Sequence, residues 1–153
     1  MPDPMTGPMT GQRDQTVNRP AEAPATAGVI PYVAMHGRAA EAADFYIRAF
    51  GALDRGRLPL DDAPGQLIHC QLDVNGGGLM MTDCVAPGEP RLAPQGFHLQ
   101  LVVDDADFWW DRAVAAGCTV QVPLQRMFWG DRWGMLADPF GLTWAIDEPR
   151  EAR

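Results

Sequence analysis

The chain has 153 residues, 46% of them hydrophobic and five of them tryptophan, so it can bury the core of one ordinary domain or of two small modules without metal or disulfide staples. Its formal net charge of −8 argues against nucleic acid and against anionic membranes as partners, because both bind basic surfaces. The absence of serine and lysine excludes a serine nucleophile, a Schiff-base lysine and a Walker-type phosphate loop.

The sequence favours a cytoplasmic protein. No apolar run approaches the roughly 20 residues of a membrane span, and the N-terminus lacks the basic-then-apolar order of a signal peptide. The three cysteines, Cys70, Cys84 and Cys118, form no CxxC pair and are odd in number, which indicates reduced thiols rather than a disulfide framework. The true start codon could be that of Met1, Met5 or Met9.

Strand and helix signals in the first half follow a flexible tail over residues 1–27, which is rich in Pro, Thr, Gly and Ala and has no apolar period. Residues 29–35 are β-prone, and apolar residues then recur at helical spacing from Ala42 to Phe50, with Gly51 as a natural stop. Further strands are expected over residues 52–58, 66–74 and 78–84, the last two joined by a hairpin at Asn75-Gly76-Gly77.

The second half repeats this order after a Pro- and Gly-rich linker over residues 85–96. A strand over residues 97–103 precedes a helix that begins at the acids Asp104 and Asp105 and ends at Gly117. The remaining elements are a strand over residues 118–122, a loop, and two strands joined by the turn Asp138-Pro139-Phe140-Gly141.

The two halves, residues 28–84 and 97–148, both read as strand, helix and three strands. The run Ala43-Asp44-Phe45-Tyr46 in the first helix is echoed by Ala106-Asp107-Phe108-Trp109 in the second. We therefore expect an α+β fold of two paired βαβββ modules. Each helix covers one face of its sheet, and the two faces that are left over can line a cavity.

Strand alternation indicates which side chains occupy the left-over faces. If the hairpin after Val74 has an even number of loop residues, the first face carries His69, Gln71, Met80 and Thr82; an odd number would flip half of this set. The face of the second module carries His98, Gln100, Val102, Thr143 and Ala145. An apolar surface with several neutral hydrogen-bonding groups suits an uncharged, partly aromatic or oxygenated ligand better than a phosphate.

The loop over residues 127–132 brings Trp129, Asp131 and Arg132 together, which is typical of a binding rim. Trp129 could stack on a bound ring, and Arg132 could contact the same ligand. In the alternative, structural interpretation Arg132 only pairs with Asp131 or Asp138.

His69 and His98 are the candidate catalytic residues. Two imidazoles that face a cavity could act as acid and base, or could bind a divalent metal together with Asp83. Cys84 shares the face of His69, so a Cys/His nucleophile is a further alternative. Ordinary hydrogen-bonded histidines of a sheet would explain the same pattern without catalysis.

Several motifs resemble a known family. They are residues 39–46 with Phe50-Gly51, the strand of His69, the run Ala113-Val114-Ala115-Ala116-Gly117, and Phe128-Trp129-Gly130-Asp131-Arg132 leading to the Asp138-Pro139-Phe140-Gly141 turn. With these motifs, residues 29–146 resemble the vicinal oxygen chelate superfamily (glyoxalase I, bleomycin-resistance protein, extradiol dioxygenases), and within it the PhnB-like branch. The resemblance implies that the paired modules form a cavity-lining, incomplete barrel, commonly in a homodimer.

The resemblance also implies where a divalent metal (Zn, Ni, Fe or Mn) would bind, because catalytic members hold it with His or Glu on the first and fourth strands of each module. The matching positions here are Pro31, Thr82, His98 and Ala145, and only His98 can coordinate a metal. We therefore expect a protein that binds a small, largely uncharged organic ligand without a catalytic metal or cofactor.

Two other functions remain open. One is a metal-dependent lyase, isomerase or dioxygenase of the same superfamily that uses His98 and His69, and the other is a non-catalytic interaction module. A methyltransferase is not predicted, because no glycine-rich nucleotide loop follows a strand.

Overall fold

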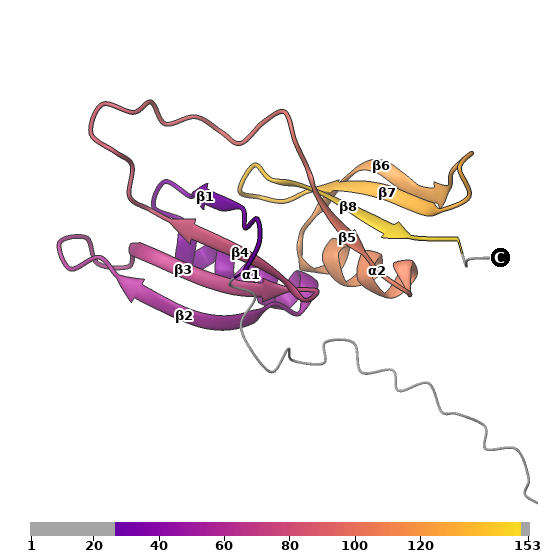
Figure 1. The fold of residues 1–153 in the computed structure, drawn as a ribbon, viewed down its shortest axis with the longest axis horizontal. Helices are drawn as coiled ribbons and strands as arrows, with labels where there is room; N and C mark the ends of the chain where they lie inside the picture. Colours follow the sequence, from indigo (N-terminus) through magenta and orange to yellow (C-terminus); the bar gives the residue numbers. More distant parts are fainter. Residues whose placement is uncertain (1–26, 151–153) are drawn as a thin grey trace, which may run out of the picture.

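Two βαβββ modules follow one another along the chain in the computed structural model, which describes residues 27–150 (Figure 1). The first module contains β1 (Tyr32–Ala34), α1 (Ala39–Phe50), β2 (Leu53–Pro59), β3 (Leu67–Val74) and β4 (Gly77–Thr82). The second contains β5 (Leu99–Val102), α2 (Ala106–Ala116), β6 (Thr119–Arg126), β7 (Arg132–Ala137) and β8 (Thr143–Glu148). Apart from Ala27, the predicted tail lies outside the described residues.

Each module folds into its own four-stranded sheet, with the strand orders β1-β4-β3-β2 and β5-β8-β7-β6. The first and last strands of each module are parallel neighbours, and the other pairs are antiparallel. The predicted α+β duplication is confirmed. The sheets are separate and do not close into a barrel, so the incomplete barrel is seen as two open halves.

The helix α1 forms where the apolar stripe predicts it. Ala42, Phe45, Tyr46 and Ala49 are buried against the sheet, and Gly51 ends the helix in a left-handed conformation (φ 62°) while its N–H donates to the carbonyl of Ile47. The start of α1 is fixed by hydrogen bonds to the residue that follows β4. The buried carboxylate of Asp83 accepts hydrogen bonds from the N–H groups of Gly37 and Ala39.

The helix α2 begins at the predicted N-cap, where Asp105 Oδ1 accepts from the N–H of Phe108 at 3.0 Å. Glu148 of β8 accepts a second hydrogen bond from the N–H of Ala106. The two helices pack against each other (Figure 1). At this contact Arg112 of α2 donates to the carbonyls of Ile47 and Arg48 in the last turn of α1.

A buried carboxylate also joins the two modules. Asp138, in the turn between β7 and β8, accepts from the hydroxyl of Tyr46 in α1 and from the indole N–H of Trp144 in β8. Its other oxygen accepts from the N–H groups of Phe140 and Leu142, which fixes the turn. Burial and then the charge of Asp138 raise the pKa of Tyr46, so the hydroxyl stays a donor.

Strand boundaries differ from prediction where proline intervenes. The first strand was expected over residues 29–35 but is confined to Tyr32–Ala34, directly after Pro31. The sixth strand was expected over residues 118–122 but extends from Thr119 to Arg126. Pro123 is accommodated there because β6 is an edge strand with register shifts around this residue.

Candidate functional site

The face of the first sheet away from α1 carries the predicted set of side chains, because the turn between β3 and β4 contains two residues, Asn75 and Gly76. Gly77, predicted in the turn, is the first residue of β4. The even turn brings Gln71 opposite Met80, while Cys70 and Met81 are buried on the side of α1. The residues of this first open face are Tyr32, Leu58, His69, Gln71, Met80 and Thr82.

On the first open face, Tyr32 Oη lies 2.7 Å from Nδ1 of His69, and their ring centroids are 5.5 Å apart. The amide Nε2 of Gln71 is buried and has no hydrogen-bond partner among the described residues. A buried donor without a partner destabilises the protein, so the Gln71 N–H can donate a hydrogen bond to an oxygen atom of a ligand.

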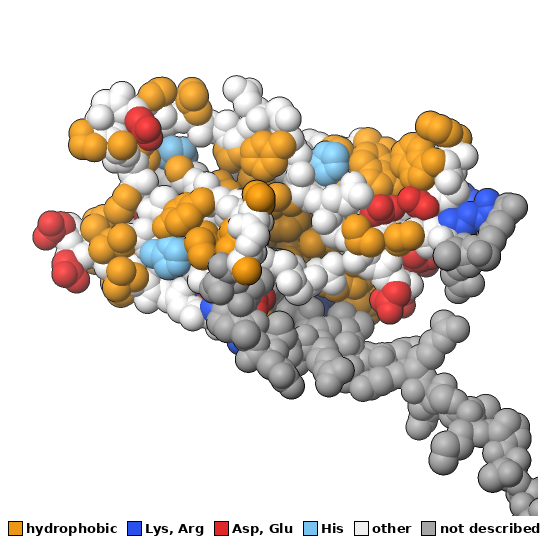
Figure 2. Space-filling model, in the orientation of Figure 1, with side chains coloured by type: hydrophobic (Ala, Val, Ile, Leu, Met, Phe, Trp, Pro, Cys, Tyr) orange, Lys and Arg blue, Asp and Glu red, His pale blue; other side chains and the backbone are white. Residues whose placement is uncertain are grey.

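The second open face lies on the side of its sheet away from α2. His98, predicted inside the fifth strand, lies directly before β5 but keeps the parity of Gln100. Strand pairing adds further side chains of β7 and β8 to this face. Its residues are His98, Gln100, Val102, Trp133, Met135, Thr143, Ala145 and Asp147. Figure 2 shows histidine and apolar side chains over both modules on one face of the molecule.

Hydrogen bonds connect the polar groups of the second open face. The indole N–H of Trp133 donates to Gln100 Oε1 over 3.4 Å, and Gln100 Nε2 donates to Asp147 Oδ2 over 2.9 Å. His98 Nε2 lies 3.4 Å from the same oxygen of Gln100, and its ring meets Trp133 edge-on at 6.2 Å. This arrangement orients an indole edge and an imidazole toward one patch of surface.

The predicted rim residue Trp129 is 46% exposed and lies beside the second open face. Its ring centroid is 6.2 Å from that of Trp133 and 4.9 Å from that of the almost fully exposed Phe128. An exposed aromatic row of this kind offers a planar ligand both a face and an edge.

Sequence reasoning placed Asp131 at this patch but missed its acidic neighbour Asp147. Asp147 is only 8% exposed, and its Oδ1 atom has no hydrogen-bond partner in the described part of the chain. Burial, and then the neighbouring carboxylate of Asp131, raise the pKa of Asp147. The same alternation that identified Thr143 and Ala145 would have found Asp147 one step further along β8.

Two predicted roles are corrected by the structure. Arg132 pairs with neither Asp131 nor Asp138; it points toward α2, where it makes two 2.7 Å hydrogen bonds to Asp107. That pairing lowers the pKa of Asp107 and raises that of Arg132. Asp83 does not face the histidines, because its carboxylate caps α1 and also accepts from the N–H of Leu67.

The cysteines include no close pair and are free among the described residues. Burial raises the pKa of the Cys70 thiol to about 11 and that of the Cys118 thiol to about 12, which makes both poor nucleophiles. Cys84 is exposed.

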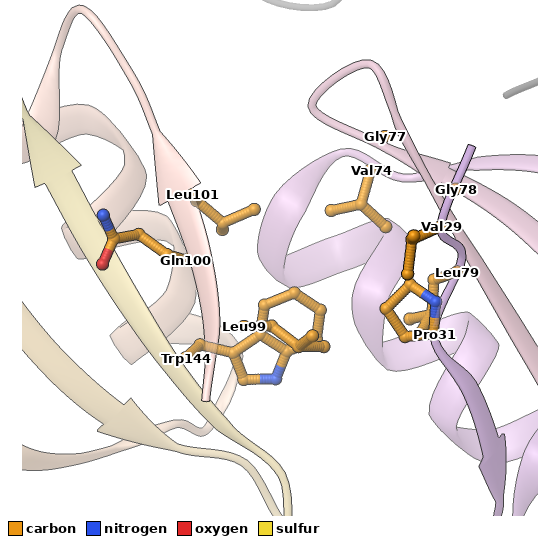
Figure 3. Close-up of a pocket in the computed structure, with 10 residues that line it drawn as sticks. All are labelled: Val29, Pro31, Val74, Gly77, Gly78, Leu79, Leu99, Gln100, Leu101 and Trp144. Atoms are coloured by element: carbon orange, nitrogen blue, oxygen red, sulfur yellow. The ribbon is translucent and has the colours of Figure 1, made fainter. Parts of the chain in front are cut away.

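A pocket of about 230 Å³ lies at the seam between the modules (Figure 3). Leu101 and Val74 point toward each other across it, whereas the side chain of Gln100 points away. Its lining is largely apolar and, apart from Gln100, includes none of the predicted ligand-binding residues. The ten lining residues are Val29, Pro31, Val74, Gly77, Gly78, Leu79, Leu99, Gln100, Leu101 and Trp144.

The register of the first strand moves one of the four positions expected for a metal. Tyr32 and Ala34 face the open side with Met80 and Thr82, while Pro31 has the opposite parity. The first-strand position equivalent to His98 is therefore that of Tyr32. Within residues 27–150, no three His, Cys, Asp or Glu side chains lie close enough together to hold a metal ion.

Comparison with known proteins agrees with this architecture. The sequence profile of the Glyoxalase/Bleomycin resistance protein/Dioxygenase superfamily matches residues 29–146. The chain belongs to this superfamily. No helix of the described residues is long and apolar enough to span a membrane.

Relatives of this superfamily member include the uncharacterized protein Mb0911c of Mycobacterium bovis, which is 41% identical over 118 residues, covering 72% of this chain and 76% of that protein. The solved structure of PA1353 from Pseudomonas aeruginosa is 29% identical, with a TM-score of 0.69 over 82% of this chain and all (100%) of that one. A PhnB protein from Bacillus cereus, described as a putative 3-demethylubiquinone-9 3-methyltransferase, shares the fold at 20% identity and a TM-score of 0.66, covering 80% of this chain and 100% of that one.

Proposed function

We propose that this superfamily member binds a small, largely uncharged organic molecule between open faces of its modules, without a catalytic metal or other cofactor. The observation that carries the proposal is the composition of the two open faces: the first has an unused buried amide, and the second has neutral polar groups and an exposed aromatic row. A planar ring with oxygen substituents matches these groups. The free thiols fit a reducing compartment, and we propose the cytoplasm.

The proposed ligand contacts come from both faces. They are His69, Gln71, Met80 and Thr82 from the first open face and His98, Gln100, Thr143 and the rim residue Trp129 from the second. Arg132 is left out, because its guanidinium is committed to Asp107 on the other side of the sheet.

We further propose that a homodimer completes the cavity. In a single chain the open faces leave large apolar side chains exposed, among them Tyr32, Leu58, Val102 and Trp129. Grouped apolar side chains on a surface favour association. A second copy would cover one open face with the other and would enclose the ligand.

A metal-dependent enzyme is the second candidate, because His98 keeps a position that holds metal in catalytic relatives. Tyr32, Thr82 and Ala145 fill the other three positions with side chains that are poor ligands or none. The sequence has no glycine-rich nucleotide-binding loop after a strand, and we therefore do not propose a methyltransferase.

The test combines three measurements on the purified chain. Light scattering after size exclusion should give a dimer mass, and elemental analysis should give less than one divalent metal per chain. A thermal-shift screen of aromatic metabolites and antibiotics should identify ligands, which should quench tryptophan fluorescence in the wild type and less in Trp129→Phe. A full equivalent of Zn, Ni, Fe or Mn that is lost in His98→Ala would support the enzyme instead. The proposal would be contradicted if the protein were a monomer and no compound changed its melting temperature.

A further inference from the structure

Neither acid of the pair on the second open face, Asp147 and Asp131, forms a salt bridge with a described residue. Asp147 receives one hydrogen bond, from Gln100, and leaves its Oδ1 atom buried without a partner. Asp131 beside it accepts from the backbone N–H of Arg150, and its carboxyl lies within hydrogen-bonding reach of that of Asp147. Arg132 binds Asp107 and Arg126 donates to the carbonyl of Gly130. The side chain of Arg150 lies against Gly130 and forms no salt bridge with either acid among the described residues.

A buried carboxylate is normally paired, because the free energy of burying an unpaired charge is large. The second carboxylate, that of Asp131, increases the free-energy cost of ionising Asp147. Either the two acids share a proton, or a cation from outside the chain completes the pair.

Aromatic rings surround the same patch. Trp133 pairs directly with Asp147 across β7 and β8, the ring of His98 lies edge-on to Trp133, and Trp129 continues the row to the surface. Carboxylates behind aromatic rings favour an organic cation, which gains from the charge and from the ring faces together. A bare metal ion gains little there, because the described residues offer it too few ligands.

We infer that the second open face binds the protonated amine of an otherwise uncharged aromatic ligand, with Asp147 and Asp131 as the anionic partners and Trp129 and Trp133 as the aromatic wall. This inference rests on the proposed function and specifies that the ligand carries one positive charge on an otherwise uncharged aromatic body. The overall charge of −8 would draw such a ligand toward the protein.

The experiment uses three phenols that share the 4-hydroxyphenyl ring and differ in the end group, and so the charge, of a two-carbon side arm: tyramine (cation), tyrosol (neutral) and 4-hydroxyphenylacetate (anion). Each is titrated into the full-length protein at neutral pH by calorimetry and ligand-observed NMR. Tyramine should bind about tenfold more tightly than tyrosol, and 4-hydroxyphenylacetate should bind most weakly.

Substitutions locate the effect. Asp147→Asn and Asp131→Asn should each reduce tyramine affinity toward that of tyrosol and leave tyrosol unchanged. Asp62→Asn, at an exposed loop, removes the same charge far from the patch and should change neither ligand. Asp147 lies in β8 and Asp131 in a loop. If one of the two variants does not fold, the other still tests the assignment.

The outcomes separate the two proposals. Equal affinity for tyramine and tyrosol, or tyramine affinity that survives both substitutions, would overturn the cation assignment and leave the ligand cavity standing. Failure of all three phenols to bind, together with a thermal-shift screen without hits, would overturn both.

Discussion

The carboxyl group of Asp147 is buried beside Asp131, and this should cost the free protein stability. A carboxyl whose pKa is raised by folding destabilises the folded state when it is ionised, and the penalty disappears where both states are protonated. Asp147→Asn should therefore raise the free energy of unfolding by about 1 kcal/mol at pH 7. The gain should fade as pH falls and be absent near pH 3, below the ordinary aspartate pKa of about 3.9.

Denaturant titrations of both proteins at several pH values measure this difference. A variant that is less stable than the wild type at pH 7 would show that a partner outside the described residues already neutralises Asp147.

Asp138 has the opposite character, because all of its hydrogen-bonding capacity is used inside the protein. It accepts from Tyr46, Trp144 and two backbone N–H groups. Asp138→Ala would leave these buried donors without partners and should cost about 3 kcal/mol or more. Asp62→Ala, on an exposed loop, should stay within about 0.5 kcal/mol of the wild type in the same urea titration. Equal stability of the two variants would contradict the proposed importance of the buried network.

Individual side chains were predictable only as far as alternation reaches. His69, Gln71, Met80 and Thr82 were placed together from the sequence, because a two-residue turn fixes the register of a hairpin. The hydrogen-bond partners of Arg132 and Asp83 were not predictable from the sequence. Arg132 meets Asp107 across the interface of helix and sheet, and Asp83 caps a helix 44 residues earlier in the chain. Neither contact leaves a local pattern in the sequence.

The strand β7 packs tightly on α2 at Gly134. A Cβ atom added there would lie 2.6 Å from the ring of Trp110 and 2.8 Å from the Cα atom of Leu124. The ring could move, but the backbone of β6 could not move cheaply, so Gly134→Ala should cost about 1 to 3 kcal/mol.

The matched control is Gly77→Ala in β4, where the nearest atom to an added Cβ is the Val74 carbonyl oxygen at an ordinary 3.5 Å. It should be nearly neutral. If both glycine variants melt at the wild-type temperature, the helix and sheet are less closely packed than the structure indicates.

The helices and strands themselves were largely predictable. Apolar periodicity and Gly51 located α1, and Asp105 located the start of α2. The lengths of the shorter strands were less predictable, since the end of a strand depends on its neighbour. The edge strand β6 continues past Pro123 because only one of its sides must pair with another strand.

The two modules should unfold together. Asp138 of the second module binds Tyr46 of the first, and Arg112 binds the end of α1 across the same interface. Calorimetry at a fixed protein concentration should therefore show one transition whose calorimetric and van't Hoff enthalpies agree after allowing for dissociation of the proposed dimer. Two resolved transitions would mean that the modules are independent.

How the modules sit against each other could not be read from the sequence. Repetition of strand, helix and three strands indicates a duplication, but the contacts between the copies join residues far apart in the chain, such as Tyr46 with Asp138 and Arg48 with Arg112. The left-over faces were expected to line a cavity, and in one chain they remain open to solvent with the sheets unclosed.

The end of the first helix depends on a side chain of the second module, because Arg112 donates to carbonyls in the last turn of α1. The carbonyl of Arg48 lies in the last turn of a helix, and the side chain that donates to it is 64 residues further along the chain. During synthesis this contact of the first helix can form only after the second half of the polypeptide has been made.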